Sequence, residues 1–280
     1  MSKSIIKNII RLSGYELHKQ GFCTDPAILG ISQNNKYPYI KTYEFLGVSF
    51  KFWIINKEME ELYNLDLIKN YSEFLELNKL IKRGDRILEV GSNQGFFFTF
   101  MSKLVGVDGY VVGLEPLPKN AIIACSQIGL NDNSSFTAIL NAAASFDSSN
   151  VFLTRSSHNA SVAERNINNT VETKSITCDS LLETYKSFDL IKIDVEGYEE
   201  NVLKGCQKIL ETKPKLAIEL HMPFIKKYNS TLSNIFNLIN INHYDGTMIF
   251  RKDKTKSYPF DPKLINNDVI NLFLKPKVNI

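Results

Sequence analysis

The sequence lacks the features that mark membrane, secreted and nucleic-acid-binding proteins. No window of its 280 residues approaches the roughly 18 uninterrupted apolar residues of a membrane span. Its four cysteines, Cys23, Cys125, Cys178 and Cys206, form neither a C-x-x-C pair nor a cysteine and histidine cluster. The net charge of +3 comes from 33 basic and 30 acidic residues spread along the chain. We therefore expect a protein of the reducing cytoplasm with free thiols, no transmembrane segment and no nucleic-acid partner.

What is present is the composition of a globular protein. The length and a hydrophobic fraction of 44% suit one large domain, or one ordinary domain with a small addition. Residues 3–11 carry apolar pairs at helical spacing with basic residues between them, which predicts an amphipathic helix packed on the rest of the protein. A membrane-surface or partner helix is the alternative. The densest basic runs, 252–256 and 275–277, are interpreted as solvated loops.

Residues 1–75 form a predicted N-terminal extension or cap, and residues 76–280 form the predicted main domain. The extension is irregular, apart from an alternating, aromatic-rich piece over 43–55 that predicts a strand and holds the one tryptophan. A helical pattern over 71–81 and a turn at 82–85 then lead into the first strong strand.

Strand-like apolar runs alternate with helical patterns along the main domain. Parallel strands need crossover helices of this kind, so the alternation predicts an α/β fold with a doubly wound, mostly parallel sheet. The last two runs, 244–251 and 269–274, are joined by a loop without a helical pattern, which favours an antiparallel pair closing the sheet edge. The other predicted strands are 86–90, 110–115, 136–143, 188–195 and 216–220, and the predicted helices are 96–105, 119–128 and 198–210.

The stretch from Glu89 to Gly95, E-V-G-S-N-Q-G, follows a buried strand and precedes a helix. Gly91 and Gly95 allow a positive φ and a close backbone approach, so the stretch is either a plain connection or a loop that holds a nucleoside cofactor. A dinucleotide site would carry G-x-G-x-x-G, whereas the pattern here is E-x-G-x-N-x-G. This spacing leaves room for a bulkier ligand without phosphate, such as S-adenosylmethionine.

Polar and small residues follow the next strands, and ligands of open α/β sheets bind beyond the carboxyl ends of strands. Glu115 ends the second strand, where a carboxylate either holds two ribose hydroxyls or favours a helix N-terminus. The small residues 141–144 leave space for an adenine or merely pack closely. Residues 157–161 are polar, and an ordinary loop is the better interpretation for them.

Ionisable residues gather at the ends of two further strands. Period-two alternation places Lys192, Asp194 and Glu196 on one side of an apolar strand, where charges are costly unless they pair or bind something. Glu219 and His221 end the following strand with the same spacing. If the strands are neighbours, the carboxylates and the imidazole meet the glycine-rich loop at one rim. They can act as general base on a substrate hydroxyl or hold a divalent metal, and the sequence does not decide between the two.

These stretches resemble the FkbM-type family of S-adenosylmethionine-dependent methyltransferases. The most specific piece is K-I-D-V-E-G at 192–197, followed by a helix that contains V-L-K-G. The resemblance implies a class I methyltransferase (Rossmann-like) fold, which is a seven-stranded, mostly parallel sheet with an antiparallel C-terminal strand. It also implies O-methylation, often of sugars in surface glycans or of hydroxyls in secondary metabolites. The matching stretches are 89–95, 114–116, 141–143, 189–199 and 219–221.

The resemblance also implies roles for single residues. One group of them would line the cofactor. The methionine end would be lined by Glu89, Gly91, Asn93 and Gly95, the ribose by Glu115, and the adenine by Ala142 or Ala143. Four residues would face the reacting methyl group, namely Asp194, Glu196, Glu219 and His221. Asp194 would also contact the cofactor. We expect His221 to be the general base, because its ordinary pKa of about 6.5 leaves it largely neutral at physiological pH. Lys192 is expected to pair with the carboxylates.

The predicted function is therefore O-methylation of a small hydroxylated acceptor, a carbohydrate before others, with S-adenosylmethionine as cofactor. A nicotinamide-dependent oxidoreductase is an alternative, disfavoured because the third glycine of its fingerprint is missing. A catalytically silent partner or scaffold protein is another, and the costly charges of Asp194, Glu196 and His221 argue against it. Dependence on a divalent metal and assembly as a homodimer stay open at this point.

Overall fold

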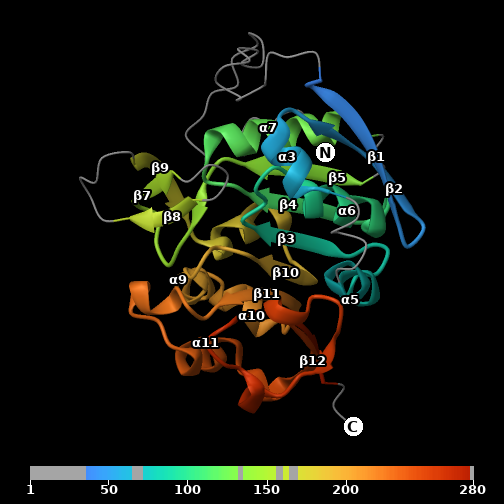
Figure 1. Ribbon diagram of the computed structural model, residues 1–280. Helices are drawn as coiled ribbons and strands as arrows, with labels where there is room; N and C mark the ends of the chain where they lie inside the picture. Colours follow the sequence, from blue (N-terminus) through green and yellow to red (C-terminus); the bar gives the residue numbers. More distant parts are fainter. Residues whose placement is uncertain (1–35, 65–71, 132–134, 156–159, 164–169, 278–280) are drawn as a thin grey trace.

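The computed structural model describes most of the chain after residue 35 (Figure 1). The described ranges are 36–64, 72–131, 135–155, 160–163 and 170–277. The predicted amphipathic helix at 3–11, Cys23 and residues 157–159 of the polar loop lie outside them.

A mixed sheet of eight strands, in the order β13-β12-β14-β11-β10-β3-β4-β5, forms the centre of the molecule (Figure 1). Five neighbouring strands, from β11 to β5, are parallel, and β14 runs antiparallel to both β11 and β12. This confirms the predicted class I methyltransferase sheet, with the two-residue β13 added at the edge. The strands are β3 (Arg86–Val90), β4 (Tyr110–Leu114), β5 (Phe136–Leu140), β10 (Leu190–Ile193), β11 (Lys215–His221), β12 (Tyr244–Phe250), β13 (Tyr258–Pro259) and β14 (Val269–Pro276).

Helices cover both faces of this sheet. Successive strand residues point to opposite sides, so apolar side chains lie on both faces and need to be covered. Ile87 packs into one core cluster with helices of the first face, and its neighbour Leu88 packs into the other cluster. On the first face lie α5 (Ser72–Leu80), α6 (Phe96–Val105) and α7 (Pro118–Gly129). On the second face lie α8 (Leu182–Tyr185), α9 (Glu199–Lys204), α10 (Gln207–Glu211) and α11 (Leu232–Ile239).

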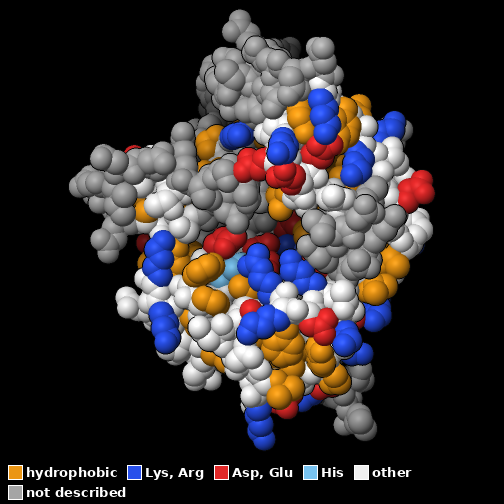
Figure 2. Space-filling model, in the orientation of Figure 1, with side chains coloured by type: hydrophobic (Ala, Val, Ile, Leu, Met, Phe, Trp, Pro, Cys, Tyr) orange, Lys and Arg blue, Asp and Glu red, His pale blue; other side chains and the backbone are white. Residues whose placement is uncertain are grey.

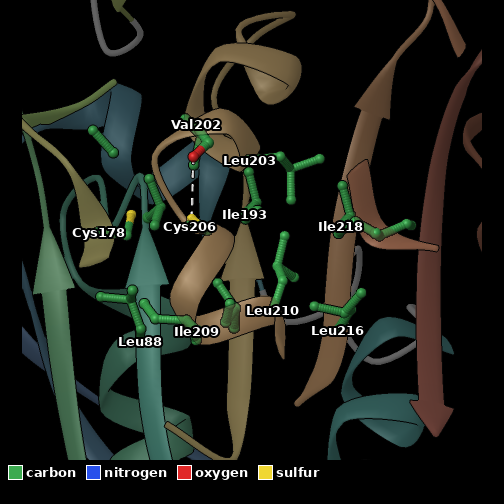
Figure 3. Close-up of a cluster of buried hydrophobic side chains, with 14 of the residues drawn as sticks. Leu88, Cys178, Ile193, Val202, Leu203, Cys206, Ile209, Leu210, Leu216 and Ile218 are labelled. Atoms are coloured by element: carbon green, nitrogen blue, oxygen red, sulfur yellow. Dashed lines mark hydrogen bonds between the residues drawn. The ribbon is translucent and has the colours of Figure 1, made fainter. Parts of the chain in front are cut away.

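The second face is filled mainly by aliphatic side chains (Figure 3). Strand residues such as Ile193 and Ile218 meet side chains from α9 and α10, and all of them are almost fully buried. The Sγ of Cys206 donates a hydrogen bond to the carbonyl oxygen of Val202 at 3.1 Å, so this thiol acts as part of the core. Cys206, Cys178 and Cys125 are free thiols, as expected.

An antiparallel hairpin, β1 (Tyr39–Phe45) and β2 (Val48–Ile54), precedes the main domain and is followed by α3 (Lys57–Leu62). The single strand predicted over 43–55 was therefore wrong, since the chain reverses at Leu46 and Gly47, whose φ values are 51° and 80°. Positive φ at both central residues is the geometry of a tight hairpin turn. Leucine rarely adopts it, and so the sequence signal was weak.

The hairpin shares a core with the first face of the main domain. Phe50 and Phe52 contact the ring of Phe96, the first residue of α6, with centroids 5.3 and 5.0 Å apart. Tyr63 stacks on Phe96 at 4.7 Å. The described part of the extension thus packs directly on the helix that follows the glycine-rich loop.

A side chain from α7 and another just beyond it bind the free edge of β2. Gln127 accepts from the backbone nitrogen of Trp53 at 2.7 Å and donates to its carbonyl oxygen at 3.1 Å. Asn131, just beyond the end of α7, binds the backbone of Lys51 in the same two-way manner, at 2.9 and 2.8 Å. Each amide takes the place of a peptide group in a neighbouring strand.

A second, four-stranded sheet was not predicted from the sequence. It contains β6 (Ala143–Ala144), β9 (Thr170–Ile176), β7 (Asn150–Arg155) and β8 (Ala160–Ala163), in that order. The strand expected over 136–143 ends at Leu140 because Asn141 donates through Nδ2 to the carbonyl oxygens of Glu115 and Pro116. The chain therefore leaves the main sheet at Asn141.

Two other predicted elements are shorter than expected. The strand predicted over 188–195 covers only Leu190–Ile193. The helix predicted over 198–210 is divided into α9 and α10 near Gly205, where an added Cβ would lie 2.1 Å from the carbonyl oxygen of Ser145. Helix α11 was not predicted.

Candidate active site

The glycine-rich loop between β3 and α6 is held against the ends of two neighbouring strands. The backbone nitrogen of Gly91 donates to the carbonyl oxygen of Leu114 at 2.9 Å. Gly91 has a φ of 88°, and a Cβ on it would lie 1.9 Å from the backbone oxygen of Asp194. Only glycine fits there, because the loop crosses directly over the end of β10. Asn93, with a φ of 48°, is in the left-handed region as well.

Glu115 ties this loop to the end of β4. Its Oε2 accepts from the backbone nitrogen of Asn93 at 2.8 Å, and its Oε1 accepts from that of Leu117 at 2.9 Å. Burial raises the pKa of Glu115 to about 7, and these two backbone hydrogen bonds oppose the rise. The side chain of Asn120 is a third hydrogen-bond partner, which leaves about one of the roughly four lone-pair sites of the carboxylate for a ligand hydroxyl.

A small cavity of about 100 Å³ lies beside Glu115. Ala142 and Ala143, which were predicted to lie on the adenine side of the cofactor, line this cavity. Sequence reasoning missed Asn120, Leu153 and Tyr198, which line it too. Leu153 belongs to the unpredicted second sheet, so nothing in the local pattern could have placed it there.

A larger cavity of about 270 Å³ adjoins the small one. Gly91, Asn93, Asp194 and Glu196 line both cavities, so the two spaces meet at these residues. Gly95 lines neither of them: it caps α6, and its Cβ position lies 3.0 Å from Ala124 of α7. Figure 2 shows a hollow on this face, with acidic side chains and a histidine inside and basic side chains around it.

The predicted cluster of ionisable residues does assemble on the wall of the larger cavity. Nε2 of His221 lies 3.4 Å from Oε2 of Glu196 and 3.9 Å from Oδ1 of Asp194. Glu196 reaches this position with a φ of 55°, immediately after β10 has ended. Glu219, on the same strand as His221, completes the group.

Glu199 is a member of the site to which sequence reasoning gave no role. Its Oε1 lies 2.8 Å from Nδ1 of His221, and both side chains are almost fully buried. Its place one turn after the strand end, beside Glu196 and Gly197, was the available signal.

The surroundings change the protonation of His221. Burial lowers its pKa, but the hydrogen bond with Glu199 and the charges of Asp194 and Glu219 outweigh burial and raise the pKa to about 9. The expectation that His221 is largely neutral at physiological pH was therefore wrong. Burial, together with repulsion from Asp194, also raises the pKa of Glu219, to about 8.

Lys192 pairs with carboxylates, as predicted. Its Nζ lies 3.8 Å from Oε1 of Glu89 and 3.8 Å from Oδ2 of Asp194, and it sits 4.9 Å above the ring of Phe97. Burial raises the pKa of Glu89 to about 7, although the Lys192 charge opposes this. The resident cation therefore offsets part of the acidic charge within the cavity.

The cluster also has the composition of a metal site. Each of Asp194, Glu219 and His221 offers one ligand atom, and these atoms lie within 4.8 Å of one another. One imidazole and two carboxylates are ligand types that divalent cations accept.

The profile of the methyltransferase FkbM domain matches residues 89–245, more than half of the chain. The matched region holds the glycine-rich loop, Glu115 and the whole cluster around His221. The chain belongs to the FkbM methyltransferase family. This FkbM protein is accordingly an S-adenosylmethionine-dependent methyltransferase, and the nicotinamide and silent-scaffold alternatives are set aside.

Individual similarities to the FkbM protein are more distant. Ribosomal RNA large subunit methyltransferase E of Methanococcus maripaludis is 29% identical over 92 residues, which cover 28% of this chain and 36% of that protein. The chain thus spans about a third of that relative's length.

The similar solved structures include two at low identity. Fibrillarin of Aeropyrum pernix, with natively bound S-adenosylmethionine, is 14% identical with a TM-score of 0.42, over 84% of this chain and 82% of that one. An S-adenosylmethionine-dependent O-methyltransferase of Thermotoga maritima is 13% identical with a TM-score of 0.40, over 86% and 79% of the two chains.

The residues present in the FkbM protein fit this cofactor. Oε2 of Glu89 is buried and has no hydrogen-bond partner among the described residues, so it can accept from a ligand amine. Glu115 lines the small cavity and keeps an acceptor site there beside its three hydrogen bonds. Within the described ranges, no helix is both long and apolar enough to cross a bilayer.

Proposed function

We propose that the protein methylates a hydroxyl group of a small acceptor, a sugar or glycan precursor first and a secondary metabolite next. The observation that carries the proposal is the junction of the two cavities. Asp194 and Glu196 line both, so a nucleoside in the small cavity and an acceptor in the large one would meet beside His221. Proximity of this kind is a large part of what a transfer reaction needs.

The small cavity and the glycine-rich loop would hold the cofactor. Glu115 would accept from the ribose hydroxyls, Ala142 and Ala143 would lie against the adenine, and Glu89 would receive the methionine amine. Gly91 and Asn93 would line the passage between the two cavities, and Asp194 would face the methyl-bearing end of the cofactor. Once bound, the cofactor supplies a methyl group already activated by its sulfonium.

The protein's own task is to orient the hydroxyl and accept its proton. Nε2 of His221 is our proposed acceptor of that proton, with Glu199 as the positioning residue behind it. Asp194 and Glu196 lie beside the same nitrogen, Glu219 lies in the same cluster, and the three carboxylates would hold the hydroxyl by hydrogen bonds.

The test is methyl transfer from labelled cofactor to a panel of sugar nucleotides, glycans, phenolics and ribosomal RNA. The proposal expects the labelled methyl group on a hydroxyl oxygen of a small carbohydrate, so that the product is a methyl ether. Label found only on RNA, or only on nitrogen, would refute it. Running each reaction with EDTA and with added Mg²⁺ shows whether Asp194, Glu219 and His221 work with a metal.

We further propose that the protein acts in the reducing cytoplasm. Cys178 and Cys206 are both buried side chains of one core cluster and are both free thiols, which suits a reducing compartment. Cell fractionation tests this location. Sedimentation tests assembly as a homodimer.

A further inference from the structure

The basic run at 252–256 does not lie wholly in solvent as the sequence suggested. Lys252 and Lys256 are exposed, but Lys254, together with the preceding Arg251, lines the larger cavity. Both cavity-lining cations follow β12, on or beside the short helix Arg251–Asp253. Figure 2 shows basic side chains gathered around the hollow on this face.

This segment has a defined position relative to the cavity. The carbonyl oxygen of Lys254 accepts from the backbone nitrogen of Ser72, the first residue of α5, at 2.9 Å. Asp253 is the one acid between residues 251 and 256, and it is engaged by the hydroxyls of Thr255 at 2.8 Å and Tyr258 at 3.1 Å. The acid of the segment is therefore turned toward its own neighbours, while Arg251 and Lys254 face the cavity.

Charged side chains line the cavity from its inner wall to its mouth. Inside, the buried Lys192 and His221 accompany Glu89, Asp194 and Glu196. Arg251 is exposed and Lys254 is half-buried, so these two cations lie on the solvent side of the cavity. Acids face them there as well, because the charge of Arg251 acts on Glu196 and that of Lys254 acts on Glu73.

We propose that Arg251 and Lys254 form a subsite for an oxyanion carried by the acceptor, so that the preferred substrates are hydroxyl compounds bearing a phosphate or a carboxylate. The inference rests on the proposed function and narrows it. Arg251 offers a planar fork of donors that matches phosphate and carboxylate, and Lys254 adds a point charge. The acceptor hydroxyl would point inward to His221 while its anionic group stays at the mouth.

The experiment compares two double variants of the same segment. Arg251→Ala with Lys254→Ala removes the two cavity-lining charges, whereas Lys252→Ala with Lys256→Ala removes two exposed charges and serves as the matched control. Each double variant is assayed on pairs of acceptors in which one member carries an anionic group and the other lacks it. The anionic group is a phosphate in one set of pairs and a carboxylate in the other. We expect KM for the anionic acceptors to rise about tenfold or more in the first variant and to stay within about twofold in the control.

A binding measurement makes the test independent of turnover. Calorimetry with inorganic pyrophosphate as the probe should show binding to the unaltered protein and to the control, and none to the Arg251 and Lys254 variant. Equal KM for neutral and anionic acceptors would overturn the inference, as would equal effects of the two double variants. If neutral hydroxyls are methylated equally well, only this inference fails. If no hydroxyl is methylated, or RNA alone is, the proposed function fails with it.

Discussion

Nδ1 of His221 lies 2.8 Å from Oε1 of Glu199, and neither side chain is more than 2% exposed. The hydrogen bond fixes the plane of the imidazole, which leaves Nε2 directed toward Asp194 and Glu196 in the cavity. A carboxylate in this place also stabilises the protonated ring. Orientation and a raised pKa thus have the same cause.

Methyl transfer should increase with pH between 7 and 9. With a pKa of about 9, only about one His221 in a hundred is neutral at pH 7, so the rate should grow about tenfold per pH unit until the ring has lost its proton. The groups that face His221 and set this value are Glu199, Asp194, Glu196 and Glu219. A pH profile of kcat/KM at saturating cofactor measures it.

Glu199→Gln separates His221 from Glu219 as the titrating group. Glutamine removes the negative charge of Glu199 and weakens the hydrogen bond that raises the His221 pKa, so the rising limb should move to lower pH. His221→Ala should lower the rate by about 10²-fold or more at every pH. If the rising limb of the pH profile stays in place in Glu199→Gln, another group takes the proton. If a chelator abolishes activity, His221 is a metal ligand instead.

Affinity for the cofactor should weaken below pH 7. Burial raises the folded-state pKa of Glu115 to about 7, and its protonated form is the poorer acceptor for ribose hydroxyls. Protonation of Glu115 alone should therefore increase Kd by up to about tenfold for each pH unit below 7. Calorimetry with S-adenosylhomocysteine tests this. Glu115→Gln should bind weakly with a smaller slope, the remainder arising from Glu89, whose pKa is also about 7.

Gly91→Ala should damage the site from within the backbone. The new Cβ would overlap the backbone oxygen of Asp194, and alanine would be forced to a φ of 88°. We expect a loss of about 2–5 kcal/mol in the free energy of unfolding and at least about tenfold weaker cofactor binding. Gly129→Ala is the control, since nothing lies within 4 Å of its Cβ position. Urea titration of both variants measures the free energies of unfolding. Equal values for Gly91→Ala and Gly129→Ala would contradict the prediction.

Phe50→Ala tests whether residues 1–75 and 76–280 fold separately. Phe50 is 2% exposed and packs on Phe96 and Phe100 of the main domain. We expect a loss of about 3–5 kcal/mol in one cooperative transition. Phe146→Ala, at a site that is 53% exposed, should change stability by less than about 1 kcal/mol. Two separate transitions would support the predicted boundary as a folding boundary.

The parts of the fold that sequence could predict are those with strong local patterns. The strand Arg86–Val90 and the helix Phe96–Val105 have the predicted bounds, because a buried apolar run and a helical period each determine their own structure. The second sheet was missed because its strands are partly polar, as in T-V-E-T-K-S-I of β9, and carry no long apolar run. The family resemblance implied the number of strands and the antiparallel C-terminal strand, whereas the order of the strands was not predicted, since no residue pattern states which strand lies beside which.

The site shows the same division. Asp194, Glu219 and His221 were predicted together because strand ends share one rim of the sheet, and the structure places their ligand atoms within 4.8 Å of one another. The raised pKa of His221 was beyond reach, because it depends on Glu199 approaching from α9. The positions of Arg251 and Lys254 depend on a loop whose path is determined by packing on Ser72.

The amide side chains of Gln127 and Asn131 have a consequence for how the protein behaves at high concentration. Two residues along β2, from Lys51 to Trp53, advance by about 6.7 Å, close to the rise of four residues along a helix. The two amides therefore meet the strand edge in register and satisfy its exposed peptide groups. An edge occupied in this way cannot accept a strand from another molecule, so the β2 side of the aromatic hairpin is protected from the edge-to-edge pairing that starts aggregation.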